Sequence, residues 1–499
     1  MRKSTRVVIL RASRAAGSIA KGADTMRFLW FVLLSLFLGF TPESARAQAQ
    51  KASDPPVFLS GGTLVDVIRG EVYPDVGVLA EGGKITGLFF DFAYNASRIP
   101  ANAVRVDVKG KYLIPGMMDL HAHAQSNYKG VRVNLPHFLK IFLAGGVTTI
   151  RAMGSAEDNL VRLKHDVDTG VIAGPNIVIG SFPPFEQAPG FPRVERTVMV
   201  NTALQARALT RDHIFNGAEW VKFYNYGDRE IVSAVVDEAH KHGAKVFGHF
   251  TMLGADDAAR LGVDSLEHTT SLIQKSLSYD DSIAMTDIGY YRYFVLWNKL
   301  DQKKLDETFK VMIENKTALI PTLAIQYVGA DPNHLTKISG EWFDLYQKDL
   351  YAAYLKDPLR VPTVYNFKAY EEPWKASILA QARQVAHFVK MGGKVGTGSD
   401  LSPAPPLVPG LSIRQELELY VQGGMTPLEA LRSATLVSAE ILGWQDRFGS
   451  IEIGKQADIV VLNGNPLADI KAVGNIDSVM QAGRVYKISD LTAELRRAP

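Results

Sequence analysis

The chain has 499 residues, 46% of them hydrophobic and 21% charged, which is enough for a large barrel with a small second domain. It contains no cysteine, so disulfides, thiolate metal ligands and a cysteine nucleophile are excluded. The 55 basic and 52 acidic residues nearly balance, and nothing in that balance predicts a nucleic-acid partner.

The first 47 residues have the pattern of a cleaved secretory signal peptide. Met26 and Arg27 precede a short apolar run over 28–40, and a small-residue cleavage site ends at Ala47. We therefore expect translation to start at Met26, cleavage near Ala47, and a periplasmic or secreted protein without a stable membrane span. The alternative is an uncleaved membrane anchor, although the run is short for a spanning helix. Without the leader, 47 basic and 50 acidic residues remain, a net charge of −3.

Both ends of the remaining chain are rich in β-forming residues. From 48 to 111, short β-rich runs alternate with glycine turns such as Gly61-Gly62. The segment from 447 to 499 has the same character, with an apolar run over 459–462. Two β-rich ends that flank one long middle predict a small β-sandwich domain that both termini build.

The middle of the chain, residues 112–446, alternates apolar strands with helical stretches, the βα pattern of a parallel sheet or barrel. Eight strands are predicted, near 112–120, 147–152, 176–180, 219–224, 244–249, 263–268, 318–323 and 394–400. Helices are predicted between them, for example over 135–144, 202–215, 229–242 and 376–391. Eight repeats favour a (β/α)8 TIM-type barrel. A doubly wound open sheet is the alternative, but no Gly-x-Gly-x-x-Gly turn follows a strand.

Two connections, 269–317 and 324–375, are longer than barrel loops need, and both are rich in aromatic residues. Long loops at the catalytic end of a barrel usually cover a pocket or a partner. Packing of extra helices explains them equally well. As pocket covers, they would predict a bulky apolar group in the substrate.

Side chains that suit a metal ion stand at the ends of five predicted strands. His121 and His123 are two residues apart, so in a strand both imidazoles point to one side. Four further candidates end later strands: Lys222, His249, His268 and Asp400. A lysine on a barrel strand is costly unless it is paired or modified, so a structural salt bridge is the alternative for Lys222. Because strand carboxyl ends share one rim of a barrel, we expect these groups to lie together.

The same motifs resemble the amidohydrolase superfamily, and within it the imidazolonepropionase-like and prolidase-like branch. The resemblance rests on residues 113–123 as the metal-binding opening, on 424–435 as the helix after the last barrel strand, and on 449–460 as the return to the small domain. It covers nearly the whole mature chain. These motifs are specific for the superfamily and not for one substrate.

The resemblance implies two divalent metal ions, usually zinc. His121, His123 and Asp400 would bind the more buried ion, and His249 with His268 the second. It also implies that Asp400 takes a proton from the attacking water and passes it to the leaving nitrogen.

Lys222 would be an N6-carboxylysine that bridges both ions, because a carbamate is an anionic oxygen ligand. Many relatives carry a Ser-Gly-Gly run where this chain has Asn225 and Tyr226, which implies a different local pocket. Position at strand ends suggests four residues for contact with the substrate: Arg151, Tyr224, Tyr226 and Tyr327. Structural packing explains each of them equally well.

The sequence therefore predicts a binuclear metal-dependent amidohydrolase. Its substrate would be a small molecule with an amide bond, either a dipeptide such as Xaa-Pro or an N-acyl amino acid, cleaved by a metal-bridging hydroxide. One alternative is a cyclic-amide (imidazolone-type) hydrolase, a lactone hydrolase or a deaminase with one metal ion. A barrel without catalysis that acts as a binding protein is the non-enzyme alternative. Many relatives form oligomers, but no stretch of this sequence identifies the interface of a homo-oligomer.

Overall fold

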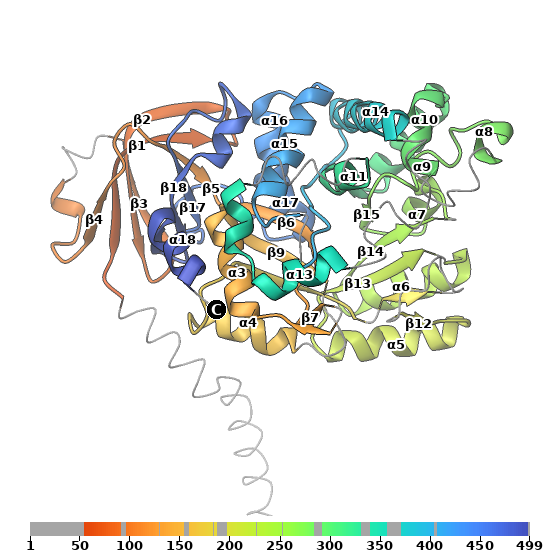
Figure 1. Cartoon of the computed structure of the whole chain (residues 1–499), viewed down its shortest axis with the longest axis horizontal. Helices are drawn as coiled ribbons and strands as arrows, with labels where there is room; N and C mark the ends of the chain where they lie inside the picture. Colours follow the sequence, from red (N-terminus) through yellow and green to blue (C-terminus); the bar gives the residue numbers. More distant parts are fainter. Residues whose placement is uncertain are drawn as a thin grey trace, which may run out of the picture. The chain divides into compact units, whose positions relative to one another are not determined.

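The computed structural model describes the chain from residue 54 to residue 497, with short gaps. The described ranges are 54–90, 96–128, 130–153, 159–182, 184–186, 197–225, 227–251, 253–283, 292–330, 340–356, 371–403 and 407–497. The predicted leader, with its start at Met26 and its cleavage site near Ala47, lies outside them. Within them the chain forms a parallel barrel with surrounding helices and a separate mixed sheet, so the predicted fold class is confirmed (Figure 1).

Seven parallel strands form most of the barrel, and neighbours in the barrel are also neighbours along the chain. They are β6 (Met117–Ala122), β9 (Val147–Met153), β10 (Asn176–Gly180), β13 (Trp220–Asn225), β14 (Lys245–Phe250), β15 (Ser265–Glu267) and β16 (Ala318–Ile320). All residues of β6, β9 and β10 are buried. This is expected for strands that face helices on one side and the barrel interior on the other.

The eighth predicted strand, 394–400, closes the barrel between β16 and β6 without forming a regular strand. Isolated parallel bridges join this segment to β16 at Val395 and to β6 at Leu401. The amide of Asp400 donates to the carbonyl oxygen of His121 over 2.7 Å. Closure of the barrel therefore places Asp400 beside the strand that carries the first two histidines.

The first predicted strand, 112–120, consists of two strands that belong to different sheets. β5 (Tyr112–Pro115) joins the small sheet, and β6 begins at Met117. Gly116 lies between them because the side chain of Thr148 leaves no space for a Cβ atom, which would approach Thr148 Oγ1 to 2.0 Å. The small domain thus extends four residues past its predicted boundary.

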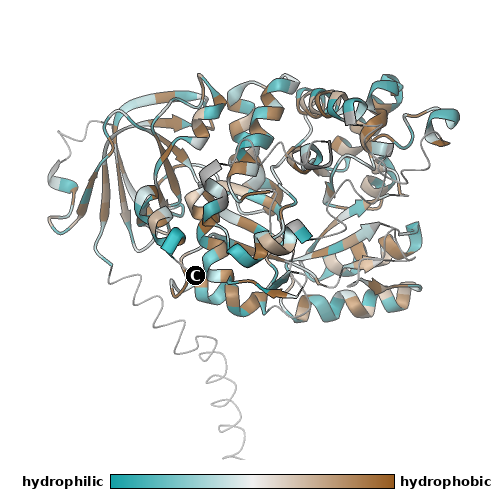
Figure 2. Cartoon of the chain, in the orientation of Figure 1, coloured by the Kyte–Doolittle hydropathy of each residue, from teal (hydrophilic) through white to brown (hydrophobic). Residues whose placement is uncertain are grey.

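Helices cover the outside of the barrel, and several begin with a side chain that caps the first turn. They are α3 (Leu135–Ala144), α4 (Leu160–Asp168), α5 (Ala203–Phe215), α6 (Arg229–Lys241), α7 (Ala255–Arg260), α10 (Gln302–Glu314), α14 (Glu371–Lys390), α15 (Leu411–Gly423), α16 (Pro427–Ala434) and α17 (Leu436–Leu442). The four helices predicted as examples appear as α3, α5, α6 and α14. Asn134, Thr202 and Asp228 accept hydrogen bonds from backbone amides of α3, α5 and α6. The outer helices α5 and α6 carry hydrophilic and hydrophobic residues in turn (Figure 2).

Large apolar side chains fill the barrel interior. Strands contribute Met118, Leu120, Trp220, Phe247 and Ile320 to one buried cluster. Helix α17 and the turn after it add Ala439, Ile441, Leu442 and Phe448 to the same cluster. The interior is therefore a packed core, as is usual for this architecture.

The small domain is one continuous mixed sheet built by both ends of the described chain. Its strands are β1 (Val57–Asp66), β2 (Glu71–Glu81), β3 (Lys84–Phe89), β4 (Val104–Asp107), β5, β17 (Ile459–Leu462), β18 (Ile476–Gln481) and β19 (Arg484–Lys487). They pair in the order β19-β18-β17-β5-β1-β2-β3, with β4 beside β1. The antiparallel pair of β5 and β17, in which Ile114 is opposite Val460, joins the two ends. Buried side chains from both ends, including Leu59, Val78 and Val461, share one cluster.

The two long connections contain additional short helices. The first holds α8 (Tyr279–Ile283), α9 (Arg292–Val295) and η3 (Leu296–Lys299), and the second holds α11 (Leu323–Ala330), η4 (Gly340–Leu345) and α13 (Lys348–Lys356). Several of their described aromatic residues are buried, although Tyr279 is 78% exposed. The rings of Phe294 and Trp374 stack with centroids 5.9 Å apart, and the Tyr346 hydroxyl donates to Leu407 O over 2.5 Å. These contacts favour packing for the described aromatic residues, and the apolar-substrate hypothesis stays a prediction.

Shorter elements complete the described chain: η1 (Ala96–Arg98), β7 (Asn127–Tyr128), β8 (Val131–Arg132), β11 (Phe185–Glu186), β12 (Val198–Met199), η6 (Ile470–Gly474) and α18 (Ile488–Arg497). In this part of the chain, no helix combines the length and the apolar character that crossing a lipid bilayer requires.

Candidate metal centre

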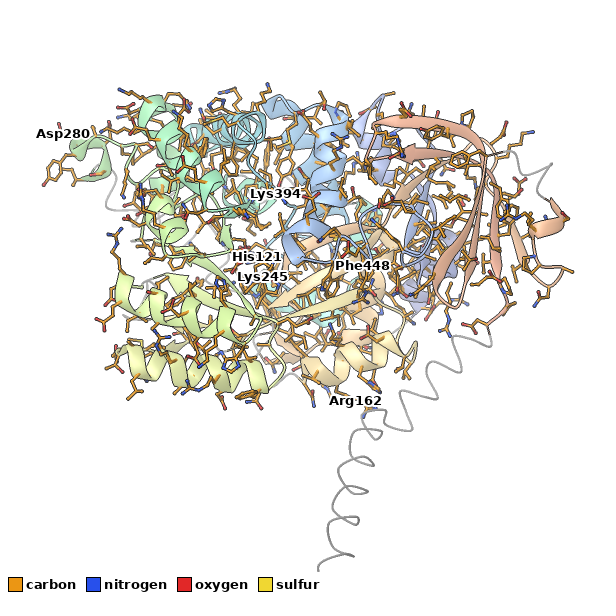
Figure 3. All side chains as sticks on the ribbon, turned by 180° about the vertical axis from the view of Figure 1, so that it is seen from behind. His121, Arg162, Lys245, Asp280, Lys394 and Phe448 are labelled. Carbon is orange, nitrogen blue, oxygen red and sulfur yellow. The ribbon has the colours of Figure 1, made fainter. Side chains whose placement is uncertain are left out.

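The candidate ligand residues all lie where the barrel strands end. His121 lies in β6, Lys222 in β13 and His249 in β14. His123 follows β6, His268 follows β15, and Asp400 is the last residue of the closing segment 394–400. His121 lies between the barrel strands in the interior of the protein (Figure 3). The expectation that these strand ends meet at one rim therefore describes the geometry correctly. Whether the residues bind metal ions stays a prediction.

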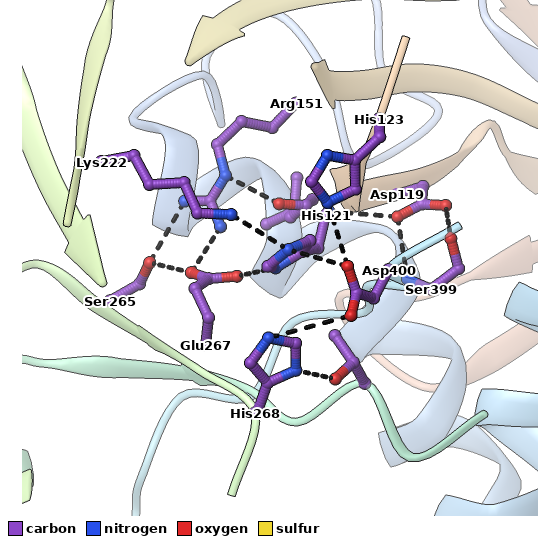
Figure 4. Close-up of polar contacts among 12 residues, drawn as sticks. Asp119, His121, His123, Arg151, Lys222, Ser265, Glu267, His268, Ser399 and Asp400 are labelled. Carbon is purple, nitrogen blue, oxygen red and sulfur yellow. Dashed lines mark hydrogen bonds and ion pairs between the residues drawn. The ribbon is translucent and has the colours of Figure 1, made fainter. Parts of the chain in front are cut away.

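Three imidazoles converge on the carboxylate of Asp400 (Figure 4). Its Oδ1 atom lies 3.0 Å from His123 Nε2 and 3.3 Å from His121 Nε2. Its Oδ2 atom lies 3.9 Å from His268 Nε2. One ligand atom each of His121, His123 and Asp400 lie within 4.8 Å of one another, close enough to hold a single metal ion.

His249 and Lys222 complete the group. The rings of His249 and His268 have centroids 4.4 Å apart, and Lys222 Nζ lies 3.4 Å from His121 Nε2. His121 is almost fully buried, with 1% of its side chain exposed, while His123 and Asp400 keep 24% and 25% exposed. A substrate can therefore approach from the side of His123 and Asp400.

The outer nitrogens of two histidines are held by neighbouring oxygens. His121 Nδ1 lies 2.5 Å from Glu267 Oε2, and His268 Nδ1 lies 2.5 Å from Thr322 Oγ1. We assign a proton to His121 Nδ1, because a carboxylate can only accept a hydrogen bond, whereas the Thr322 hydroxyl can accept from or donate to His268 Nδ1. In the neutral form of His121, Nε2 then carries the lone pair that a metal ion would bind. This is the arrangement in which protein groups behind a metal-binding histidine fix its tautomer, so these residues fit a divalent metal ion.

Glu267, which received no role from the sequence, is the residue behind His121. It is fully buried, and its Oε1 atom accepts hydrogen bonds from Arg151 Nη2 (2.6 Å) and Ser265 Oγ (2.8 Å). The sequence feature that could have pointed to Glu267 is an acidic residue in a short apolar strand, directly before His268. Such a residue needs a buried partner.

Arg151 is that partner, so this residue, predicted to contact the substrate, lies inside the barrel. The side chain is 0% exposed. Its guanidinium donates to Leu120 O (2.7 Å), Ser265 Oγ (3.1 Å) and Glu267, and it lies over the rings of Trp220 and Phe247. Arg151 therefore supports the site from within the barrel.

Asp119 is a second functional residue without a predicted role. It is 0% exposed and accepts hydrogen bonds from the amide of His121 (3.1 Å) and from the amide and hydroxyl of Ser399 (3.0 and 2.5 Å). One carboxylate thus holds the backbone at His121 and at the residue before Asp400. The sequence feature that could have pointed to Asp119 is an acidic residue inside the otherwise apolar start of strand β6.

Burial sets the charges in the site. It lowers the pKa of Lys222 to about 8 and, with the nearby Lys222 charge, lowers the pKa of His249 to about 3. Burial raises the pKa of Asp400, but its interactions with His121 and His123 outweigh this and hold the pKa well below its usual range. At neutral pH the site therefore offers a neutral imidazole of His249 and an ionised carboxylate of Asp400, the forms that bind divalent metals.

Three residues at the rim have left-handed backbones, which are uncommon outside glycine. The φ angles of His268, Thr322 and Asp400 are 62°, 48° and 55°. They end their strands early, so that β16 stops at Ile320 and does not reach the predicted residue 323. Backbone strain of this kind concentrates at functional sites, where the surrounding contacts enforce it.

The remaining substrate candidates lie at different distances from the site. Tyr224 is half-buried, and its ring stands at 85° to that of His249 with centroids 5.3 Å apart. Tyr327 is half-buried in α11, and burial raises the pKa of its hydroxyl. Tyr226 lies outside the described residues. Among the described candidates, Tyr224 therefore has a ring contact with one of the predicted ligands.

The chain is similar to known enzymes in part of its sequence and in its fold. Ochratoxinase of Aspergillus niger is 33% identical over 125 residues, which are 23% of this chain and 25% of that enzyme, so the chain spans about a quarter of that relative's length. The crystal structure of a prolidase complexed with N-methylphosphonate-L-proline is similar with a TM-score of 0.60 and 25% identity, covering 87% of this chain and 99% of that one. A Xaa-Pro dipeptidase with bound methionine shares the fold, with a TM-score of 0.61 and 21% identity over 87% of this chain and 100% of that one.

The model of the amidohydrolase family matches residues 112–486, about three quarters of the chain. This range begins with β5, includes every barrel strand and ends in β19. The resemblance noted from the sequence is thereby confirmed, and the chain belongs to the amidohydrolase family.

Proposed function

We propose that this protein hydrolyses the amide bond of a small substrate, either a dipeptide such as Xaa-Pro or an N-acyl amino acid. The observation that carries the proposal is the convergence of three imidazole Nε2 atoms on the Asp400 carboxylate at the open end of the barrel. Support for the substrate class comes from the prolidase structure with a bound proline phosphonate, to which this fold is similar.

The residues fit two divalent metal ions, for which we propose zinc. His121, His123 and Asp400 would hold one ion, and His249 with His268 the other. Bound metal ions would polarise the substrate carbonyl and lower the pKa of a bound water to about 7. The nitrogen-rich donor set, without thiolates, suits zinc among the common metals.

Lys222 would join both ions as N6-carboxylysine. Burial lowers its pKa to about 8, so about a tenth of the side chain is the neutral amine at pH 7, far more than for an ordinary lysine. The amine nitrogen can then bond to the carbon of carbon dioxide, and its proton leaves to solvent. The carbamate that results supplies an anionic oxygen close to His121, whose Nε2 atom lies 3.4 Å from Nζ.

Asp400 would move the proton during hydrolysis. Its carboxylate is ionised at neutral pH, because the histidines around it hold its pKa well below the usual range. It accepts the proton of the attacking water as the oxygen–carbon bond forms. It then delivers the proton to the leaving nitrogen as the carbon–nitrogen bond breaks. Tyr224, beside His249, is the described residue that we propose for substrate contact.

The test combines metal analysis with a substrate panel of Xaa-Pro dipeptides, N-acyl amino acids, lactones and imidazolone-type cyclic amides. Two metal ions per chain with amide hydrolysis would support the proposal. One metal ion, with activity on cyclic amides or lactones or by deamination, would replace it with the mononuclear alternative. Bound metal without activity on any dipeptide would reject the dipeptide substrate. A folded chain without metal would point to a binding protein.

We also propose export of the protein through the leader of residues 1–47. The supporting pattern is the basic start, the apolar run and the small residues that end at Ala47. Amino-terminal sequencing of protein recovered from the periplasm or medium should begin near Gln48. A chain that retains Met26 in the membrane fraction would favour the anchor.

A further inference from the structure

Helix α15 carries a buried carboxyl group that contacts the backbone beside the metal centre. Glu416 is 0% exposed, and its Oε1 and Oε2 atoms accept hydrogen bonds from the amides of Leu323 (2.9 Å) and Ala324 (2.7 Å). These are the first two residues of α11, whose amides have no partner within their own helix. The carboxyl group therefore fixes where α11 begins.

The residue before this helix connects it to His268. Thr322 has the left-handed backbone described above, and its Oγ1 atom lies 2.5 Å from His268 Nδ1. His268 is also left-handed, and its amide donates to Ile320 O over 2.8 Å. The position of the Thr322 hydroxyl, and with it the direction of the His268 ring, thus depends on how firmly residues 323 and 324 are held.

The same carboxyl group also touches the segment that carries Asp400. Tyr420 lies one helical turn after Glu416, and its hydroxyl is in hydrogen-bonding contact with that carboxyl. The hydroxyl donates to Gly396 O over 2.8 Å. Glu416 is therefore linked to the Thr322 turn and, through Tyr420, to the segment that ends at Asp400.

We propose that Glu416 is a positioning residue, which holds the Thr322 turn so that the Thr322 hydroxyl fixes the direction of the His268 ring. The inference rests on the proposed metal centre. Burial raises the pKa of Glu416 to about 8, so a buried carboxyl is a costly way to begin a helix. A surface capping box serves α16, where Thr426 and Glu429 cap each other's backbone. A buried carboxyl at the start of α11 has a reason if it supports the metal centre.

The test uses Glu416→Gln in the full mature chain, which is prepared without metal and titrated with zinc. Glutamine would turn its NH2 group toward one of the two amide donors, so that one hydrogen bond is lost. We expect the affinity for the more weakly bound zinc ion to fall about 10–100-fold, as is usual when a residue behind a ligand is changed. In metal-free protein with 15N-labelled histidine, we expect the ring NMR signals of His268 to shift, because its hydrogen bond with the Thr322 hydroxyl weakens.

Three further variants separate positioning from general stability. Glu429→Gln weakens the capping box of α16, away from the site, and should bind zinc like the wild type. Thr322→Val removes only the hydroxyl beside His268 and should reproduce the loss of zinc affinity. Thr322→Ser keeps that hydroxyl and should restore the affinity.

The outcomes distinguish this inference from the proposed function. Two zinc ions bound to Glu416→Gln and Thr322→Val with wild-type affinity would overturn the inference and leave the metal centre standing. A folded wild-type chain that binds no zinc would reject the metal centre, and the inference with it. If circular dichroism shows that Glu416→Gln does not fold, Thr322→Val provides the test, and wild-type zinc affinity in that variant would overturn the inference.

Discussion

Replacing Glu267 with glutamine tests whether this buried carboxylate sets the tautomer of His121. The carboxylate accepts hydrogen bonds from His121, Arg151 and Ser265. Glutamine keeps one oxygen for Arg151 and Ser265, but its NH2 group would face His121 Nδ1. That nitrogen would have to become the acceptor, which moves the ring proton to Nε2, the atom that faces Asp400. We therefore expect Glu267→Gln to bind zinc about 10–100-fold more weakly.

The same change should lower the free energy of unfolding of the metal-free protein by about 3 kcal/mol. Burial raises the pKa of Glu267, but the charge of Arg151 outweighs this and the pKa falls from 4.5 to about 2. A difference of that size corresponds to roughly 3 kcal/mol. Because the folded state has the lower pKa, this stabilisation is present above about pH 4.5 and is lost as the pH falls toward 2. Removing one partner of a buried ion pair costs a similar amount, about 3–5 kcal/mol.

Urea unfolding at pH 7 and zinc titration are the two measurements. The control is Glu418→Gln, which removes a partly exposed partner of Arg414 on α15 and should change stability by less than about 1 kcal/mol. The reasoning would be refuted by a Glu267→Gln protein that loses less than about 1 kcal/mol and binds zinc like the wild type. Glu267 would then be a replaceable neighbour of His121.

Three other changes give separate readouts. Lys222→Ala should reduce the metal content of protein purified with bicarbonate from two ions to about one, and an unchanged content would make Lys222 structural. Asp400→Asn should leave the circular dichroism spectrum intact and lower kcat about 10²–10⁴-fold; full activity would contradict the proton-transfer role. Ser399→Ala removes the hydroxyl that donates to Asp119 and should lower the urea midpoint by the equivalent of about 1–3 kcal/mol. An unchanged midpoint would show that the amides of His121 and Ser399 satisfy Asp119 without the hydroxyl.

The sequence was sufficient to predict the barrel and the position of the ligand group. Helical periodicity located α3 and α6 closely, because their apolar faces pack against the barrel. The ligand candidates could be brought together because parallel strands of a barrel end at one rim. That rule needs only the order of the strands and no knowledge of side-chain contacts.

The supporting residues could not be predicted, because their partners are distant in the chain. Glu267 contacts Arg151, 116 residues earlier, and Asp119 contacts Ser399, 280 residues later. An arginine at a strand end usually faces solvent or ligand, and only the position of Glu267 shows that Arg151 is internal. Strand ends were also misplaced, since periodicity does not reveal the left-handed turns at residues such as Thr322.

The chain passes from the small sheet to the barrel at Gly116, and this limits how the protein can be cut into separately produced domains. Only Gly116 separates Pro115, the last paired residue of β5 in the small sheet, from Met117, the first paired residue of the barrel strand β6. A barrel produced alone from residue 112 would carry β5 without β1 and β17, and so would expose an apolar strand edge that invites aggregation. A displacement of β5 in the small sheet would also displace His121, which lies only six residues after Pro115 in the adjoining strand. The small sheet thus holds the chain directly before the strand that carries His121.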